Sequence, residues 1–206
     1  MAQSIGYLGN SKLKKIGTAL SWTPEMVKEW EKCKLDPIYF TRTYIKIIDV
    51  DKGIINFIPY DYQEEIIRVI HENRFTIALT GRQMGKTTAL AAAIIHYVTF
   101  NDEKTVALLA NKGDTAREIL NRIQFSYENL PDYFQHGIIE YNKGSMVLEN
   151  KCRIIASSTS GNAIRGFSIS YLYIDECVEG DTKVTIRNKK TGEISTISIE
   201  DLYNTK

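Results

Sequence analysis

Several residue types on which common protein classes depend are scarce in this sequence. Its 206 residues include only three cysteines, three histidines and four prolines. Cys33, Cys152 and Cys177 are odd in number, widely spaced and without a CxxC pair, so neither a disulfide framework nor a zinc cluster is predicted. A reducing, intracellular compartment fits this cysteine content best.

Long apolar runs and an excess of one charge are also missing. No apolar stretch approaches the roughly 18 residues that span a bilayer, and the N-terminus lacks a signal-peptide pattern, so we expect neither membrane insertion nor secretion. Lys and Arg number 26 against 25 Asp and Glu, which gives a net charge of +1. The overall charge therefore neither indicates nor excludes a nucleic-acid partner.

The first third of the chain predicts a loosely held arm followed by short elements. Residues 1–21 mix Gly, Ser and Lys without periodicity, which is typical of a flexible terminus. Thr23 and Pro24 are signals for the start of a helix that Asp36 and Pro37 end. Residues 44–57 predict two strands around the turn at residues 51–53, and Asp61 begins a helix with an isoleucine-rich face.

From residue 74 onward, predicted strands alternate with predicted helices. The strands are expected at 75–79, 105–110, 152–156 and 169–174, the helices at 86–97 and 115–127, and a hairpin at 137–149. This alternation predicts an α/β fold with a mainly parallel sheet and flanking helices. After Glu176 the composition changes to two short strand-like runs, 182–187 and 194–199, and these 30 last residues cannot bury a core alone.

A glycine-rich loop at residues 80–88 lies between the strand predicted at 75–79 and the helix predicted at 86–97, the context of a P-loop. Its backbone N–H groups form an anion cradle, Lys86 reaches the outer phosphates and the Thr87 hydroxyl can bind Mg²⁺. Thr80 stands where the first glycine is usual. The alternative is a glycine turn entering an ordinary helix. The predicted nucleotide-binding residues of this segment are Gly81, Arg82, Gln83, Met84, Gly85, Lys86, Thr87 and Thr88.

A second motif, YLYIDE at residues 171–176, is an apolar strand that ends in two carboxylates. In a P-loop fold, Asp175 can hold the Mg²⁺ of the nucleotide and Glu176 can polarise the attacking water. By itself such a run is usually a strand that ends in solvent. Together with the loop at residues 80–88, it favours a catalytic site.

Two further side chains are candidates for the same site. Arg82, inside the loop, can neutralise charge on the transferring phosphate; the alternative is an arginine that faces solvent or DNA. Gln63, in the segment FIPYDYQ, offers an amide suited to the edge of adenine, although a single glutamine is usually only a polar helix residue.

The stretches FIPYDYQEEI, TGRQMGKTT, LLANKGDTAREIL, LPDYFQHGI, YNKGSMVLEN and SSTSGNAIRGFSISYLYIDE occur in this order. They resemble the ATPase domain of the large terminase subunit of tailed double-stranded DNA phages, the myovirus type in particular, over roughly residues 22–176. The resemblance implies a P-loop NTPase fold of the RecA-like (ASCE) type, here incomplete, which hydrolyses ATP with Mg²⁺ to move viral DNA into a procapsid.

Residue roles follow from this resemblance. It implies that Gln63 reads adenine, Arg82 is the in-loop arginine finger, Lys86 and Thr87 contact phosphate and Mg²⁺, Asp175 lies at the metal and Glu176 is catalytic. The implied partners are double-stranded DNA, the portal or procapsid and the small terminase subunit, with no membrane, in the cytoplasm of the infected bacterium. A helicase-like ATPase shares these motifs. The segment 163–168 and the in-loop arginine favour a terminase.

The last 30 residues, 177–206, resemble the opening block of an intein, with a cysteine, then Gly180-Asp181-Thr182, then a strand. Cys177 can attack the preceding carbonyl and convert the Glu176–Cys177 amide into a thioester by an N-to-S acyl shift. The resemblance implies a short β-rich N-intein segment of the horseshoe-shaped (HINT) fold. The alternative is a divergent terminase tail with an incidental cysteine.

We therefore predict three regions: a flexible arm (1–21), an N-terminal part of a terminase ATPase domain (22–176) and an N-intein fragment (177–206). The predicted partner of the fragment is a C-intein fused to the C-terminal terminase half, joined by protein trans-splicing. A truncated sequence of a contiguous intein is the alternative to this split arrangement.

Overall fold

The computed structural model describes residues 6–78, 80–81, 83–159, 164, 166–175, 183–187, 192, 194–198 and 201. Its first two helices share one capping residue, Asp36. The Thr23 hydroxyl accepts from the Met26 N–H at 3.3 Å and so begins α1 (Pro24–Leu35), as predicted. The Asp36 carboxylate then accepts from the N–H groups of Ile38 and Tyr39 and begins α2 (Pro37–Tyr44). The sequence analysis missed α2 because Asp36-Pro37 was taken only as a stop, although it is equally a start signal.

The segment between α2 and the glycine-rich loop follows the predictions closely. Strands β1 (Lys46–Asp49) and β2 (Gly53–Asn56) pair antiparallel. Helix α3 (Asp61–Glu72) begins at Asp61 and buries Ile67 completely. Its isoleucine-rich face packs against α4 (Lys86–Phe100), whose alanine-rich sequence is buried along most of its length.

The five-stranded sheet is mixed rather than mainly parallel. Its strands are β4 (Ile138–Tyr141), β5 (Ser145–Leu148), β6 (Arg153–Ser158), β3 (Thr105–Ala110) and β7 (Tyr171–Asp175), in that order across the sheet. Strand β3 runs parallel to both β6 and β7. The predicted hairpin, β4 and β5, pairs antiparallel onto β6 and makes the sheet mixed.

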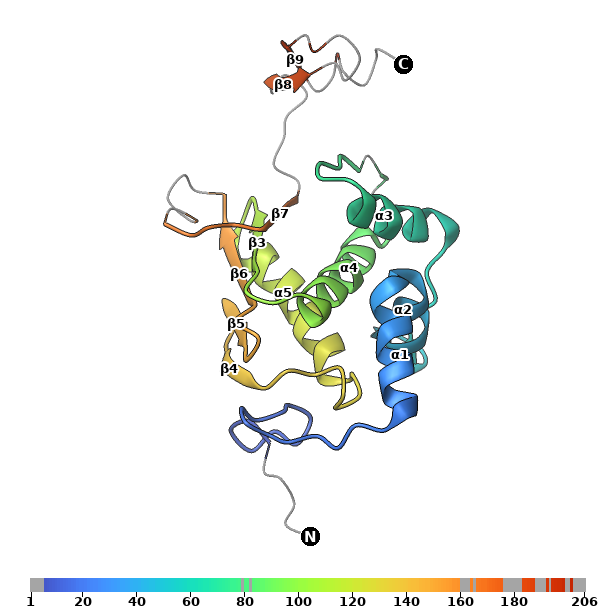
Figure 1. Cartoon of the computed structure of the whole chain (residues 1–206). Helices are drawn as coiled ribbons and strands as arrows, with labels where there is room; N and C mark the ends of the chain where they lie inside the picture. The colour runs from blue at the N-terminus through green and yellow to red at the C-terminus, as the bar shows by residue number, and fades with distance from the viewer. Residues whose placement is uncertain are drawn as a thin grey trace.

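The helices form layers on one side of this sheet. Helix α5 (Gly113–Glu128) packs on β3 and β6, α4 packs on α5, and α2 and α3 contact the far side of α4 (Figure 1). The core between these layers is aliphatic around Ile94, Leu108 and Ile123 and aromatic around Phe40 and Phe134, all almost completely buried. This arrangement brings the N-terminus of α4 close to the carboxyl end of β7.

The strand predicted at residues 75–79 is not formed over residues 75–78, and Leu79 lies outside the described residues. Phe75 and Ile77 are 84% and 73% exposed. A strand is stable only when a neighbour pairs with it, and none of the described strands does so here. Strand β7 forms an edge of the described sheet, with Leu172 and Ile174 half-exposed.

The described part of the predicted flexible arm is anchored. Leu13 is buried, the Ile138 N–H donates to the Lys14 carbonyl at 2.9 Å, and the Gln135 amide donates to the Lys12 carbonyl at 3.1 Å. These contacts cover the start of β4, because the arm supplies backbone partners that the short edge strand lacks. The sequence analysis missed this docking, since isolated apolar residues carry no periodicity.

The C-terminal hairpin follows its prediction. Strands β8 (Lys183–Arg187) and β9 (Ile194–Ser198) pair antiparallel and form a separate two-stranded sheet. Figure 1 shows this hairpin apart from the layers formed by residues 6–175.

Candidate functional site

The glycine-rich loop enters α4 with a backbone shape that needs glycine. Gly85 is the N-cap of α4 and has φ = 67°, in the left-handed region. A Cβ at this position would lie 2.4 Å from Nε2 of Gln63, so a side chain would be both strained and obstructed. No side chain in the described part of the structure caps α4, so its first N–H groups can receive an anion.

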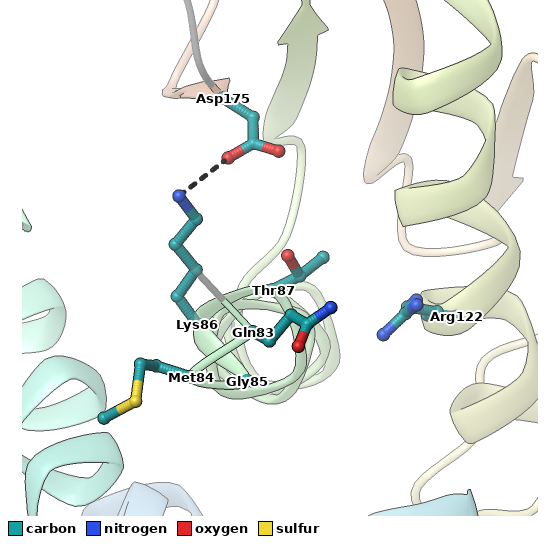
Figure 2. Close-up of a pocket in the computed structure, with 7 residues that line it drawn as sticks. All are labelled: Gln83, Met84, Gly85, Lys86, Thr87, Arg122 and Asp175. Atoms are coloured by element: carbon teal, nitrogen blue, oxygen red, sulfur yellow. Dashed lines mark ion pairs between the residues drawn. The ribbon is translucent and has the colours of Figure 1, made fainter. Parts of the chain in front are cut away.

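A pocket of about 510 Å³ lies in front of this loop. It is lined by Gln83, Met84, Gly85, Lys86, Thr87, Arg122 and Asp175 (Figure 2). Its volume is within the roughly 300–1,000 Å³ range of small-molecule sites. The structure thus brings five of the predicted nucleotide-binding residues and the predicted metal residue Asp175 to a single pocket.

Lys86 and Asp175 face one another across the pocket. The Lys86 Nζ lies 3.8 Å from Oδ1 of Asp175, although the two residues are far apart in the sequence (Figure 2). Their proximity comes from the parallel pairing of β7 with β3, which places Asp175 opposite Ala110 at the carboxyl end of the sheet. Ligand sites in α/β sheets lie at this end of the strands.

Asp175 is held by a neighbour on its own strand. The Tyr173 hydroxyl donates to Oδ1 of Asp175 at 2.7 Å, and alternation along β7 places both side chains on the same face. Asp175 is only 8% exposed. The sequence analysis missed Tyr173, although the i, i+2 spacing before an acidic strand end could have indicated it.

Gln63 lies beneath the loop. Its Oε1 accepts from the Tyr60 N–H at 3.0 Å, and its Nε2 donates to the carbonyls of Met84 at 3.2 Å and Gly85 at 3.5 Å. The Tyr62 hydroxyl also donates to the Met84 carbonyl, at 2.9 Å. Gln63 therefore fixes the loop from behind, and contact with adenine, which stays a prediction, requires Nε2 to exchange a partner.

The remaining predicted residues differ in what the structure says of them. Gly81 and Thr88 belong to the described part of the loop and of α4 but do not line the pocket. The Thr80 hydroxyl is buried, and no partner is found for it in the described part of the chain. Arg82, Glu176 and Cys177 lie outside the described residues.

Arg122 is the lining residue that the sequence analysis missed. It projects toward the loop from α5 (Figure 2), and it is not one of the buried residues of that helix. Nothing in the local sequence indicates this role, because a charged residue on an amphipathic helix is usually only solvated.

No helix in the described ranges has both the length and the apolar character that a membrane crossing requires. Residues 77–186 match the family described as terminase large subunit, T4likevirus-type, N-terminal. This match covers just over half of the chain and includes the loop, the pocket, β7 and all but the last residue of β8. The chain therefore belongs to the T4-like family of terminase large subunits, and the match is to the N-terminal part of that subunit.

Proposed function

We propose that residues 22–176 are the N-terminal part of a P-loop ATPase domain whose ATP hydrolysis drives viral DNA packaging. Membership of the terminase family implies the packaging role. The observation that carries the ATPase assignment is the pocket in which the Lys86 ammonium lies 3.8 Å from the Asp175 carboxylate. Double-stranded DNA, the portal and the small terminase subunit are the partners that we infer from the family.

The pocket fits a magnesium nucleotide by the chemistry of its donors. The uncapped N-terminus of α4 and the Lys86 ammonium suit phosphate oxygens, and the Thr87 hydroxyl and Asp175 carboxylate suit a hard divalent cation. Bound Mg²⁺ supplies electrostatic stabilisation of phosphate charge. Lys86 and Thr87 would hold the nucleotide, Tyr173 would orient Asp175, and Glu176 would accept a proton from the attacking water. Arg82 would stabilise charge on the transferring phosphate.

Two substitutions separate binding from hydrolysis in the spliced protein. Lys86→Ala should abolish productive ATP binding because it removes the charge that holds the phosphates. Glu176→Gln should preserve binding and block hydrolysis, because the amide cannot accept the proton from water. Binding is measured calorimetrically and hydrolysis by phosphate release.

Glu176 also donates the acyl group at the proposed splice junction, so the mass of each spliced product is verified first. Wild-type turnover by correctly spliced Glu176→Gln would refute the catalytic assignment. A helicase-like motor would instead unwind duplex DNA rather than fill procapsids, and a strand-displacement assay distinguishes the two functions. The match to a terminase family favours packaging.

We also propose that residues 177–206 are an N-intein fragment that joins this chain to a C-terminal terminase half by trans-splicing. Support comes from the block that begins at Cys177 and from the β8–β9 hairpin, which is consistent with a β-rich fold. The competing interpretation is an uninterrupted terminase tail. The family match runs to residue 186, beyond the proposed junction, and so gives this alternative a specific observation.

The proposed first step exchanges one bond for another. The Cys177 sulfur attacks the carbonyl carbon of Glu176, the bond from that carbon to the Cys177 nitrogen breaks, and the nitrogen takes up a proton. The resulting thioester passes its acyl group to a nucleophile at the start of the second extein. Cyclisation of an asparagine at the end of the C-intein then breaks its peptide bond to the second extein. The freed amine of that extein attacks the ester or thioester carbonyl and displaces the side-chain nucleophile, so that a peptide bond joins the two terminase halves.

Cys177→Ala should stop ligation completely and leave the fold of residues 1–176 intact. Cys33→Ala and Cys152→Ala are matched controls that should ligate normally. Burial raises the pKa of the Cys33 thiol to about 12 and raises the pKa of Cys152 as well, so both are poor nucleophiles. The assay mixes this chain with its candidate partner and follows the product by mass, with thiol-induced cleavage after Glu176 as a second readout. Ligation by Cys177→Ala, or wild-type cleavage at any other bond, would refute the assignment to Cys177. A wild type that neither ligates nor is cleaved by added thiol would favour the terminase tail.

A further inference from the structure

The pocket in front of the glycine-rich loop has a second cation on its opposite wall. Arg122 lines the pocket from α5, and Figure 2 shows its guanidinium directed toward Gln83 and Thr87. Lys86, the other lining cation, already faces Asp175 at 3.8 Å. Among the described lining residues, two cations therefore stand against one carboxylate.

The ionic contact that Arg122 makes outside the pocket is weak. Its Nε lies 3.6 Å from Oε1 of Glu118, one turn earlier on α5, and the two side chains are 52% and 62% exposed. Exposed pairs of this kind contribute about 0–1 kcal/mol, so Arg122 can exchange Glu118 for a more strongly charged ligand at little cost. A guanidinium binds two oxygens of a phosphate group at once, which makes phosphate the favoured ligand in this pocket.

We propose that Arg122 is a phosphate-binding residue of the ATP site, supplied by the same chain as the loop. The proposal rests on the proposed ATPase function and adds a residue to it. Helix α5 packs on β3 and β6 while the loop begins α4, so a nucleotide held by both Lys86 and Arg122 joins the N-terminus of α4 to the side of α5. Duplex DNA is the competing ligand for an exposed arginine. The position of Arg122 inside the pocket, opposite the loop, favours the nucleotide.

The test compares Arg122→Gln with Arg117→Gln in the full chain. Arg117 lies on the same helix, is 45% exposed, forms an ion pair with Asp114 and does not line the pocket, so it matches Arg122 in charge and element. Titration calorimetry with MgATP, MgADP and AMP measures affinity. We expect Arg122→Gln to weaken MgATP binding at least tenfold and AMP binding least, with Arg117→Gln unchanged. Arg122→Lys should restore part of the loss.

A second readout separates a binding role from a structural one. The midpoint of thermal unfolding without nucleotide should be the same for Arg122→Gln and wild type, and only the increase caused by MgATP should shrink. Unchanged MgATP affinity in Arg122→Gln, with binding abolished by Lys86→Ala, would overturn this inference and leave the ATPase proposal standing. Unchanged affinity in both variants would overturn both. Loss of binding to a DNA duplex alone would assign Arg122 to DNA.

Discussion

The buried amide of Gln63 connects the start of α3 to the glycine-rich loop. Its oxygen caps the start of α3 through the Tyr60 N–H, and its nitrogen holds the Met84 and Gly85 carbonyls from below. The side chain is almost fully buried, so water cannot replace these partners. The position of Gly85, and with it the start of α4, depends on this amide.

Substitution of Gln63 by glutamate separates the two roles. Gln63→Glu keeps an acceptor for the Tyr60 N–H but removes both N–H donors and places a carboxylate against two carbonyl oxygens. We expect the free energy of local opening at residues 83–88 to fall by about 1–3 kcal/mol, measured by amide hydrogen exchange without nucleotide.

The graded control is Tyr62→Phe, which removes one hydroxyl from the Met84 carbonyl. It should lower the same opening free energy by about 1 kcal/mol. Equal protection of the loop in wild type and Gln63→Glu would show that the amide does not hold the loop.

At the scale of elements, a buried pair of histidines joins three helices. The Nδ1 atom of His71, on α3, faces the Ile67 carbonyl at 2.8 Å, and its Nε2 lies 3.0 Å from Nδ1 of His96, on α4. The Nε2 atom of His96 lies 2.9 Å from the Cys33 carbonyl of α1. Three protons would satisfy these three contacts, whereas two neutral rings carry two, so neutral rings leave one contact without a proton.

Burial favours the uncharged form of both histidines. It lowers the pKa of both histidines, that of His96 to about 4. An unfolded histidine titrates at about 6.5, so below that pH the unfolded chain binds protons that the folded chain does not. Stability is therefore complete above about pH 6.5 and falls as the pH drops toward 4, by an amount on the order of 3 kcal/mol for His96.

The measurement is the free energy of unfolding by denaturant between pH 7.5 and pH 4.5. Other groups also titrate in this range, so the double variant His71→Gln, His96→Gln provides the reference. The wild-type profile should be the steeper of the two. Parallel profiles would mean that the two histidines do not govern the acid sensitivity of the protein's stability.

At the scale of the whole molecule, the described sheet has an open side beside the site. Strand β7 is an edge strand with Leu172 and Ile174 half-exposed. Phe75 and Ile77, before the loop, are largely exposed, and no described strand pairs with their segment. Exposed apolar side chains and an unpaired strand edge are surfaces that a neighbouring element can cover, and we propose that the C-terminal half covers them.

We expect this chain alone to bind nucleotide weakly and to hydrolyse ATP slowly. Asp175 ends the edge strand β7, and Lys86 begins α4 just after the loop. A neighbouring strand beside β7 would hold this pair in place more firmly. Steady-state phosphate release should rise strongly when the candidate C-terminal half is added and splicing proceeds, and Lys86→Ala in the same mixture provides the background.

Two other outcomes of the same measurement would contradict this expectation. A turnover equal to that of the complete motor, unaffected by the added half, would defeat the prediction. Full nucleotide affinity without turnover or a second chain would identify a module that only holds ATP.

The sequence determined the elements whose signals are local. Thr23 and Pro24 start α1, the apolar run 105–110 forms β3, Gly85 and Lys86 mark the start of α4, and the hairpin turn lies at residues 142–144. Residue type and spacing also predicted that Lys86, Thr87 and Asp175 share a site, and all three line one pocket. Their roles toward phosphate and Mg²⁺ stay predictions.

Tertiary structure decided everything that depends on a neighbour distant in the chain. Residues 75–78 have the composition of a strand but no paired partner among the described strands. Leu13 is buried where the arm bonds to the start of β4, and Gln63 bonds to a loop 21 residues away. Arg122 lies on the polar face of its helix and becomes part of the pocket only when α5 packs beside α4. Pairing, burial and hydrogen bonding across the fold depend on which surfaces come into contact. The spacing of residues within one element does not predict those contacts.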